Sequence, residues 1–181
     1  MIVDYKANFF GDKHWNELSS FLSQADQLIL YHSTSNIFLD RILKEGIKPP
    51  SKTNISNYKG EECCGKSLES NPELVYLIDY GHIHFGANGA LRKWGGELAC
   101  FRILIDDLSK LRPDEDSRKD NYHDSLAYED SCAYEGIITP EKIIGYYTIN
   151  KEQKLEYKKL KPLPENIISL EKNNIQKIVL N

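Results

Sequence analysis

One short apolar run of this chain is followed directly by four polar side chains. The run, Gln27 to Tyr31, reads as a buried strand, and the polar residues after it are His32, Ser33, Thr34 and Ser35. The end of a strand is a rigid place from which to present a side chain. One imidazole and three hydroxyls in a row suit the binding of a flat ring that bears an amide better than they suit covalent chemistry.

Two further residues stand at or near the ends of predicted strands. Tyr76 lies inside Val-Tyr-Leu-Ile-Asp, and Glu135 lies inside Ala-Tyr-Glu-Gly-Ile-Ile. Taken singly, a tyrosine in a strand is usually part of the core, and a glutamate before a glycine is usually solvated. The order of His32, Tyr76 and Glu135 along the chain, with the local context of each, is what gives the set its weight.

The elements that position the first motif can be read from hydrophobic spacing. Residues 12–26 carry an apolar face at helical intervals and predict a helix. Asn36 can cap a second helix, whose apolar face includes Ile42 and Leu43. Gly46 is placed to end this helix, and the two prolines that follow prevent it from restarting.

The rest of the chain reads as short strands joined by polar segments. We predict strands over 74–78, 97–105, 131–138 and 143–149, and a short helix or loop over 79–89. Residues 51–71 are expected to form a loop, 106–130 a long surface connection, and 151–161 a solvated tail. Because helices and strands do not alternate regularly, an α+β fold is favoured over a parallel α/β sheet.

The three motifs together resemble the ADP-ribosyltransferase superfamily. The resemblance is to its histidine–tyrosine–glutamate branch, which includes poly(ADP-ribose) polymerases and diphtheria-type toxins. The first family motif has an apolar residue, Trp or Tyr, His, Gly and then Ser or Thr, followed by Ile-Leu and Gly-Leu. It is matched by Leu30-Tyr31-His32-Ser33-Thr34, Ile42-Leu43 and Gly46-Ile47. The second is matched by Leu74 to Asp79, and the third by Glu135 with Ile137 and Ile138.

This resemblance implies a fold and a substrate. The fold would be a split β-sandwich with a few flanking helices, and NAD would lie in a cleft between the two sheets. NAD is then the substrate that supplies ADP-ribose, and no metal is expected. Residues 1–181 would form a single domain, with a core over about 27–150 and a C-terminal extension over 151–181.

The resemblance also implies a role for each motif residue. His32 would donate a hydrogen bond to the ribose beside the adenine, and Ser33 and Thr34 would hold the nicotinamide carboxamide. Tyr76 would form one wall of the nicotinamide pocket. Glu135 would bind the nicotinamide ribose and stabilise the cation that forms as nicotinamide leaves, a type of effect that typically contributes about 10²–10³-fold in rate.

The sequence departs from the family pattern at three positions. Ser33 stands where glycine is usual, so a side chain must fit there. Many relatives have a second stacking tyrosine where this chain has Ala87, and Phe85 is the residue that could stack instead. Ala133 stands where arginine-modifying relatives have an acid or amide, which disfavours arginine as the acceptor.

Composition narrows the class of protein further. The 181 residues carry 23 basic and 27 acidic side chains, a formal charge of −4, which argues against a dedicated nucleic-acid coat. There is no run long enough to span a membrane and no apolar leader, so we expect a cytoplasmic protein without a membrane partner. The four cysteines, at 63, 64, 100 and 132, lack zinc-site spacing and are expected to be reduced structural thiols.

Several other polar residues are more readily explained as solvated surface groups than as functional ones. His82 and His84 alternate like a pair of metal ligands, but no third ligand is evident nearby. Arg92 and Lys93 could meet a pyrophosphate and are more readily surface charges. His123 and Glu129, which could line the acceptor side, are expected on a solvated loop.

The function expected from these features is mono-ADP-ribosyl transfer to a macromolecular acceptor, with release of nicotinamide. The acceptor, protein or nucleic acid, and the oligomeric state are left open. An NAD glycohydrolase and an RNA 2′-phosphotransferase of related fold are the alternative enzymes. A module that binds NAD or a partner without catalysis is the alternative from another class. The small size fits a stand-alone effector such as a toxin.

Overall fold

The computed structural model describes residues 1–6, 15–55, 61–63, 66–68 and 70–170. In chain order the elements are β1 (Ile2–Tyr5), α1 (Trp15–Leu22), β2 (Gln27–Ser35), the 3₁₀ helix η1 (Asn36–Phe38), α2 (Leu39–Glu45), α3 (Pro50–Thr53), β3 (Glu61–Cys63), β4 (Lys66–Leu68), β5 (Leu74–Ile78), η2 (Tyr80–His82) and α4 (Ile83–Trp94). The second half contains β6 (Leu98–Ile105), η3 (Leu108–Lys110), β7 (Leu111–Pro113), η4 (Glu115–Ser117), α5 (Tyr122–Glu129), β8 (Ser131–Glu135), η5 (Pro140–Lys142), β9 (Ile143–Ile149), β10 (Leu155–Lys159) and β11 (Ile167–Leu170).

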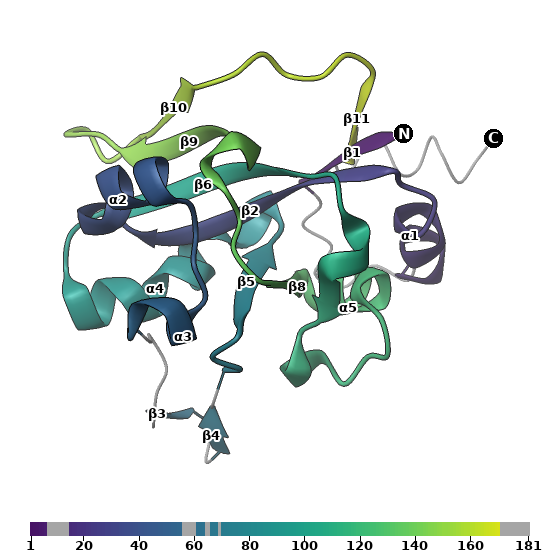
Figure 1. The fold of residues 1–181 in the computed structure, drawn as a ribbon, viewed down its shortest axis with the longest axis horizontal. Coiled ribbons are helices and arrows are strands. Elements are labelled where there is room, and N and C mark those ends of the chain that lie inside the picture. The colour runs from purple at the N-terminus through teal and green to yellow at the C-terminus, as the bar shows by residue number, and fades with distance from the viewer. Residues whose placement is uncertain (7–14, 56–60, 64–65, 69, 171–181) are drawn as a thin grey trace.

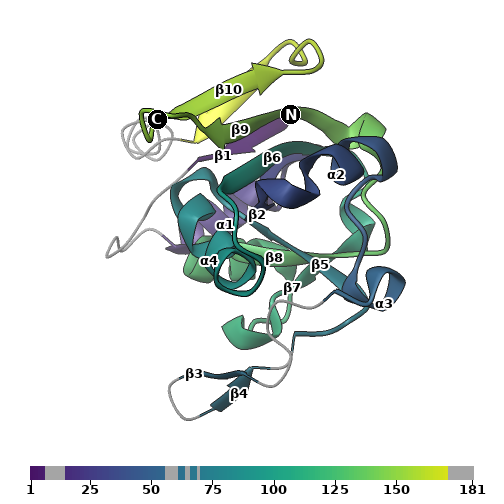
Figure 2. The same ribbon diagram turned by 90° about the vertical axis from the view of Figure 1, so that its left-hand side faces the viewer.

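A large, mostly antiparallel sheet with helices around it confirms the predicted α+β class (Figure 1). Its main path runs in the order β10-β9-β6-β2-β5-β8-β7, and β1 pairs in parallel with both β2 and β11. The strands β10 and β11 come from the predicted C-terminal extension, so part of that extension belongs to the sheet. Figure 2 shows the β3–β4 hairpin projecting away from the sheet.

Strand β2 is the centre of the fold, because it is buried on both faces. Leu28 and Leu30 pack into the cluster that includes α1 and α5, whereas Ile29 and Tyr31 pack into the cluster under α4. A strand covered on both faces reads as a continuous apolar run, which is why its first part was recognisable in the sequence. None of the helices in the described ranges is both long and apolar enough to cross a bilayer.

The sheet opens along one edge of β2. On that edge β1 pairs with residues 27–29, and β5 meets β2 at a single register pair, Tyr31 with Ile78. Beyond this pair, among the described residues, no strand pairs with 32–35 on that side. The other edge stays paired with β6 as far as Ser35. The two halves of the sheet therefore diverge at His32.

Several expectations about elements were wrong, among them the solvated tail over 151–161, which contains β10 paired with β9. The first strand does not end at Tyr31 but continues to Ser35, because β6 pairs with it along this whole length. His32 is therefore within a strand and not at its tip. Residues 106–130 are not a plain surface connection: they contain β7 and α5, and Ser125, Leu126 and Ala127 of α5 are buried.

The remaining predicted elements were largely confirmed, with shifted ends. The strands over 74–78 and 143–149 have the predicted bounds. The short helix or loop predicted over 79–89 contains η2 and the first part of α4, which extends to Trp94. The helix predicted over 12–26 covers Trp15–Leu22, its first three residues lying outside the described ranges. The loop predicted over 51–71 is wrong in part, because its described residues include most of α3 and the β3–β4 hairpin; residues 56–60, 64, 65 and 69 lie outside the described ranges. Cys100 and Cys132 are buried free thiols, as expected, and Cys64 is among the residues not described.

Candidate functional site

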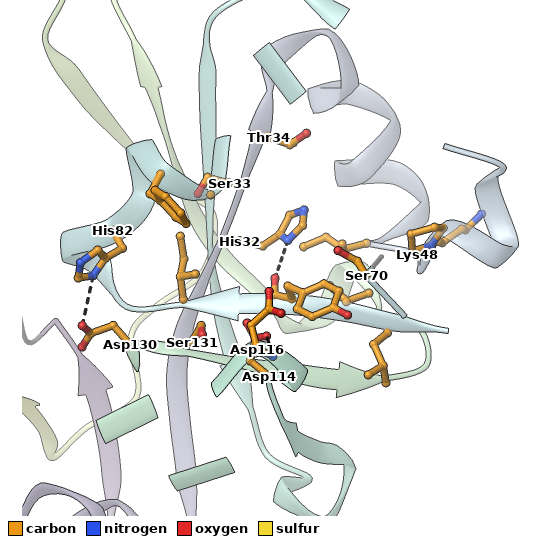
Figure 3. Close-up of a pocket in the computed structure, with 18 of the residues that line it drawn as sticks. His32, Ser33, Thr34, Lys48, Ser70, His82, Asp114, Asp116, Asp130 and Ser131 are labelled. Carbon is orange, nitrogen blue, oxygen red and sulfur yellow. Dashed lines mark hydrogen bonds and ion pairs between the residues drawn. The ribbon is translucent and has the colours of Figure 1, made fainter. Parts of the chain in front are cut away.

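A cavity of about 560 Å³ lies where β2 and β5 diverge (Figure 3). A volume of this size falls within the usual range for small-molecule sites. One wall consists of β2 and the segment from η1 to α3, and the opposite wall of β5, η4 and the junction between α5 and β8. The polar residues that line it are His32, Ser33, Thr34, Arg41, Glu45, Lys48, Thr53, Ser70, Tyr76, His82, Asp114, Glu115, Asp116, Tyr128, Glu129, Asp130 and Ser131.

His32 is fixed in this cavity by the backbone of the neighbouring strand. Its Nδ1 lies 2.9 Å from the carbonyl oxygen of Tyr76. Because a carbonyl can only accept, Nδ1 must carry the proton, and Nε2 of the neutral ring is then an acceptor. Burial lowers the pKa of His32, which favours this neutral ring.

Ser33 and Thr34 are both buried and both line the cavity. The side chain of Ser33, which stands where the family motif usually has glycine, lies against Gly86 of α4. A Cβ added at Gly86 would stand 2.9 Å from Ser33 Oγ and 2.8 Å from Ile78 Cδ1. The absence of a side chain at position 86 therefore leaves the space that Ser33 occupies.

Two aromatic rings border the cavity in different ways. The Tyr76 hydroxyl lies 2.9 and 2.7 Å from the two carboxylate oxygens of Glu115 and accepts a hydrogen bond from the amide of Asn71. Burial, with the hydrogen bond to Glu115, raises the pKa of Tyr76, so that its hydroxyl keeps its proton. Phe85 lies on the first turn of α4, lines the cavity and is 72% exposed, so its ring is accessible to a ligand.

Glu135 is not among the residues that line this cavity, although its strand partner Leu74 is. Glu135 is the last residue of β8, its side chain is 56% exposed, and it pairs with Arg112 of β7 at 2.5 Å. Glu135 is absent from the cavity lining, whereas Ser131 at the other end of the same strand is present. Leu74, the register partner of Glu135, does line the cavity, so the role expected of Glu135 stays a prediction.

A second polar cluster lies at the cavity's edge, where β5 and α5 end. Asp79 Oδ1 accepts hydrogen bonds from the amide and from Nδ1 of His82, at 2.9 and 2.6 Å. Asp130 Oδ2 lies 3.7 Å from the same Nδ1, and Asp130 Oδ1 accepts from the Tyr5 hydroxyl at 3.1 Å. Figure 3 shows His82 and Asp130 facing each other, with His32 lying between this cluster and Lys48 in that view.

Burial and mutual repulsion shape the acids of this cluster. Burial, together with the nearby Asp79 charge, raises the pKa of Asp130 to about 7. Burial also raises the pKa of Asp79, although His82 opposes that shift. The ligand atoms of Asp79, His82 and Asp130 lie within 4.8 Å of one another and are close enough to hold a cation. Because Asp79 also caps η2 through His82, hydrogen bonding already explains its position.

Charged residues outside the three motifs also line the cavity. Arg41 and Lys48 contribute positive charge on the wall formed by α2 and the turn after it, with Glu45 between them at 3.4 and 2.7 Å. The Pro-Asp-Glu-Asp segment at 113–116 contributes three acids to the opposite wall. A signal for Asp130 was present in the sequence, since it immediately precedes a predicted strand.

Of the other polar residues named from the sequence, some line the cavity and others lie outside its lining. His82 and Glu129 line the cavity, whereas Arg92 and Lys93 are not among the lining residues. His84 is exposed on α4 and lies outside the cluster of His82. The ring nitrogen of His123 lies 3.0 Å from the hydroxyl of Ser19, away from the cavity lining.

Comparison with known proteins gives little beyond this geometry. No family model matches the chain, and no curated protein matches its sequence. Among solved structures, one named EcPltA aligns with a TM-score of 0.42 and 12% identity, over 81% of this chain and 92% of that chain. Similarity at this level identifies neither a family nor an activity for the chain.

Proposed function

We propose that this protein binds NAD in the cavity between β2 and β5 and transfers its ADP-ribose to an acceptor, with release of nicotinamide. The observation that carries the proposal is the joining of the first two motifs. His32 of the first and Tyr76 of the second meet through a hydrogen bond in the wall of one hollow of suitable size. Strand order supports it, because β2, β5 and β8 are neighbours and carry the three motifs in turn.

The proposed mode of binding follows from the polar groups that face the cavity. The neutral imidazole of His32 would accept a hydrogen bond at Nε2 from a ribose hydroxyl, so its expected role as a donor changes to that of an acceptor. Ser33 and Thr34 would hold the nicotinamide carboxamide. Tyr76 would form a wall of the nicotinamide pocket, and exposed Phe85 would stack on a ring of the ligand.

The two walls of the cavity carry opposite charges, which suits a dinucleotide with an anionic pyrophosphate and a ribose that becomes cationic during the reaction. Arg41 and Lys48 line one wall and would offset the negative charge of the pyrophosphate. The acids Asp114, Glu115 and Asp130 line the other wall, where a cation would develop on the ribose as nicotinamide leaves. An RNA 2′-phosphotransferase is less well supported, because Arg41 is the one arginine among the described lining residues.

The transfer itself can be tested with NAD labelled in its adenylate phosphate. The wild-type protein is incubated with labelled NAD and a cell lysate, and the products are digested separately with protease and with nuclease. We expect label to become attached to macromolecules, and the digestion that removes it identifies the acceptor class. Free ADP-ribose as the main labelled product would instead indicate water as the acceptor. Intact NAD throughout would leave a binding module as the better description.

His32→Ala and Ile37→Ala make a matched pair for this experiment. His32 lines the cavity, whereas Ile37 is 53% exposed on η1 and is absent from the lining. Labelling is expected to fall strongly in His32→Ala and to persist in Ile37→Ala. Equal labelling by both variants would contradict the proposed binding mode.

A further inference from the structure

Two buried carboxylates lie close together at the edge of the cavity. Asp79 directly follows β5 and is fully buried, and Asp130 directly follows α5 and keeps 12% of its side chain exposed. The amide of Asp79 donates to the carbonyl of Asp130 at 3.0 Å, so the backbone itself joins the two residues. Burial, and after it the charge of Asp79, raises the pKa of Asp130. The two acids therefore repel each other where water screens them poorly.

The positive charge available to this pair of acids is limited to one imidazole. His82 Nδ1 lies 2.6 Å from Asp79 Oδ1 and 3.7 Å from Asp130 Oδ2. Among the described residues, no lysine or arginine lies within ion-pair distance of either carboxylate. Buried charges in proteins are paired or coordinate a metal, because an uncompensated buried charge is costly. A protonated His82 would offset one of the two negative charges and leave the other.

One oxygen of the Asp79 carboxylate has no hydrogen-bond partner in the described part of the chain. The two hydrogen bonds from His82, one from its amide and one from its ring, both go to Oδ1. Oδ2 is buried and unsatisfied. Buried polar atoms in native proteins are rarely left without a partner, and such an atom indicates a bound water or ion. The capping of η2 therefore explains Oδ1 only, and Oδ2 points to a further ligand.

The three side chains have the spacing of ligands around one ion. One ligand atom from each of Asp79, His82 and Asp130 can be chosen so that all three lie within 4.8 Å of one another. A tetrahedral ion with bonds of about 2.1 Å separates its ligand atoms by about 3.4 Å. The separations of 2.6 and 3.7 Å from His82 Nδ1 lie on either side of this value. Small side-chain shifts therefore bring the ligand atoms to distances that suit an ion.

Groups behind these side chains hold them in place. The Tyr5 hydroxyl lies 3.1 Å from Asp130 Oδ1 and 2.7 Å from the carbonyl oxygen of Leu126, while Asp130 Oδ2 faces His82 (Figure 3). Hydrogen bonds of this kind orient the ligands of metal sites. His82 and Asp130 also line the cavity, whereas Asp79 is not among the lining residues. An ion held by the three side chains would thus have its remaining coordination positions open toward the cavity.

We propose that Asp79, His82 and Asp130 bind one divalent first-row metal ion at the edge of the cavity. Two carboxylates and one imidazole form a mixed oxygen and nitrogen donor set, which suits Mn²⁺ or Zn²⁺. When the ion binds, Nδ1 of His82 releases its proton to solvent and coordinates through its lone pair, and each carboxylate supplies an oxygen. The charge of the ion compensates both acids. His84, which alternates with His82 in the sequence, is not part of the cluster.

The ion joins two segments that are far apart in the chain. Asp79 and His82 lie between β5 and α4, and Asp130 lies between α5 and β8. Both segments border the cavity, so the ion fixes the position of one edge of it. The resemblance to a known family implies no metal, and the site does not depend on the proposed function. A protein that fails to bind NAD can still bind the ion.

Mn²⁺ is the probe for this site, because it is paramagnetic and does not favour thiols, of which this chain has four. Chelator-treated wild-type protein is titrated with Mn²⁺, and the free ion is measured by electron paramagnetic resonance. We expect one bound Mn²⁺ per chain, its displacement by Zn²⁺, and a higher midpoint of thermal unfolding with either metal. Mn²⁺ that stays free throughout the titration, or a midpoint that neither metal raises, would overturn the proposal without any variant.

His82→Gln and Asp130→Asn test the ligands, with His84→Gln and Asp116→Asn as matched controls. Both control residues are exposed and lie outside the cluster. Asparagine tolerates the left-handed backbone at position 130, where φ is +57°, so Asp130→Asn is expected to fold. The Kd for Mn²⁺ should rise at least about 10-fold in each ligand variant and stay unchanged in the controls. Wild-type affinity in His82→Gln, or an equal loss in the controls, would contradict the assignment of these ligands.

Discussion

Nδ1 of His32 donates a hydrogen bond to the carbonyl oxygen of Tyr76, 44 residues later in the chain, at 2.9 Å. This contact crosses from β2 to β5 directly beyond the last register pair of the two strands, where the cavity begins. The contact keeps the proton on Nδ1, so that Nε2, on the other side of the ring, is a hydrogen-bond acceptor. Two residues from separate motifs are thereby tied together in one wall.

The tautomer and charge of His32 give the first prediction. Burial lowers its pKa, so the ring should be neutral, with the proton on Nδ1, at pH 6.5. The unfolded chain takes up a proton near pH 6.5, so this residue lowers folding stability as pH falls below that value. Nitrogen-15 NMR of the imidazole is expected to show the Nδ1–H tautomer. A titration midpoint at or above 6.5, or a proton on Nε2, would contradict it.

Phe85 should matter for the ligand and not for the fold. Because its ring is 72% exposed, Phe85→Ala should change the free energy of unfolding by less than about 0.5 kcal/mol. Stacking of an aromatic ring on a base contributes about 1–3 kcal/mol, so the Kd for NAD should rise roughly 5- to 150-fold. Calorimetric titration measures this rise. Ile37 is also an exposed apolar residue but lies outside the cavity lining, so Ile37→Ala should leave the Kd for NAD unchanged. An equal rise of Kd in both variants would contradict the stacking role of Phe85.

Gly86 and Ser33 should be coupled in stability. An alanine at position 86 would bring its Cβ within 2.9 Å of Ser33 Oγ and 2.8 Å of Ile78 Cδ1. Overpacking of this kind costs about 1–3 kcal/mol. Ser33→Gly removes one of the two contacts, so the double variant Ser33→Gly/Gly86→Ala should recover part of the loss. Urea unfolding of the four proteins measures the coupling, and strictly additive losses would show that the two residues do not compete for space.

The buried pair of Asp4 and Arg102 should be one of the stronger single contributors to folding. Arg102 lies 2.5 Å from Asp4, which also accepts a hydrogen bond from the Tyr31 hydroxyl at 2.7 Å, and all three residues are buried. Removing one partner of such a pair leaves a buried charge and costs about 3–5 kcal/mol. Asp4→Ala should therefore be strongly destabilised in urea unfolding. Glu152→Ala, which breaks an exposed pair with Lys154, should lose at most about 1 kcal/mol; losses of equal size would contradict this account.

Those parts of the fold that depend on local pattern were predictable from the sequence. The runs 74–78 and 143–149 are apolar over their whole length and became strands with those bounds. Gly46 ends α2 as expected, with φ of +82°. Any side chain there would also collide with the carbonyl of Ile138, a contact between distant segments that no local pattern reveals.

The errors arose where tertiary pairing overrides local composition. The polar composition of 32–35 predicts the tip of a strand, but pairing with β6 continues through these residues, and Ser35 donates to the carbonyl of Gly95 at 2.6 Å. The acidic composition of 106–130 hid the short buried face of α5. The motif predicts a role for Glu135, and only the three-dimensional structure shows that its strand partner Leu74 lines the cavity while Glu135 itself pairs with Arg112.

The most direct test of the central claim is the formation of free nicotinamide from NAD by the purified wild-type protein. Chromatography of the reaction over time measures it, with His32→Ala as the comparison. We predict steady nicotinamide formation by wild type that falls roughly 5- to 150-fold in His32→Ala, because leaving a buried hydrogen-bond partner unpaired costs about 1–3 kcal/mol. No nicotinamide from wild type, with or without lysate as a source of acceptor, would contradict the claim that this cavity cleaves NAD.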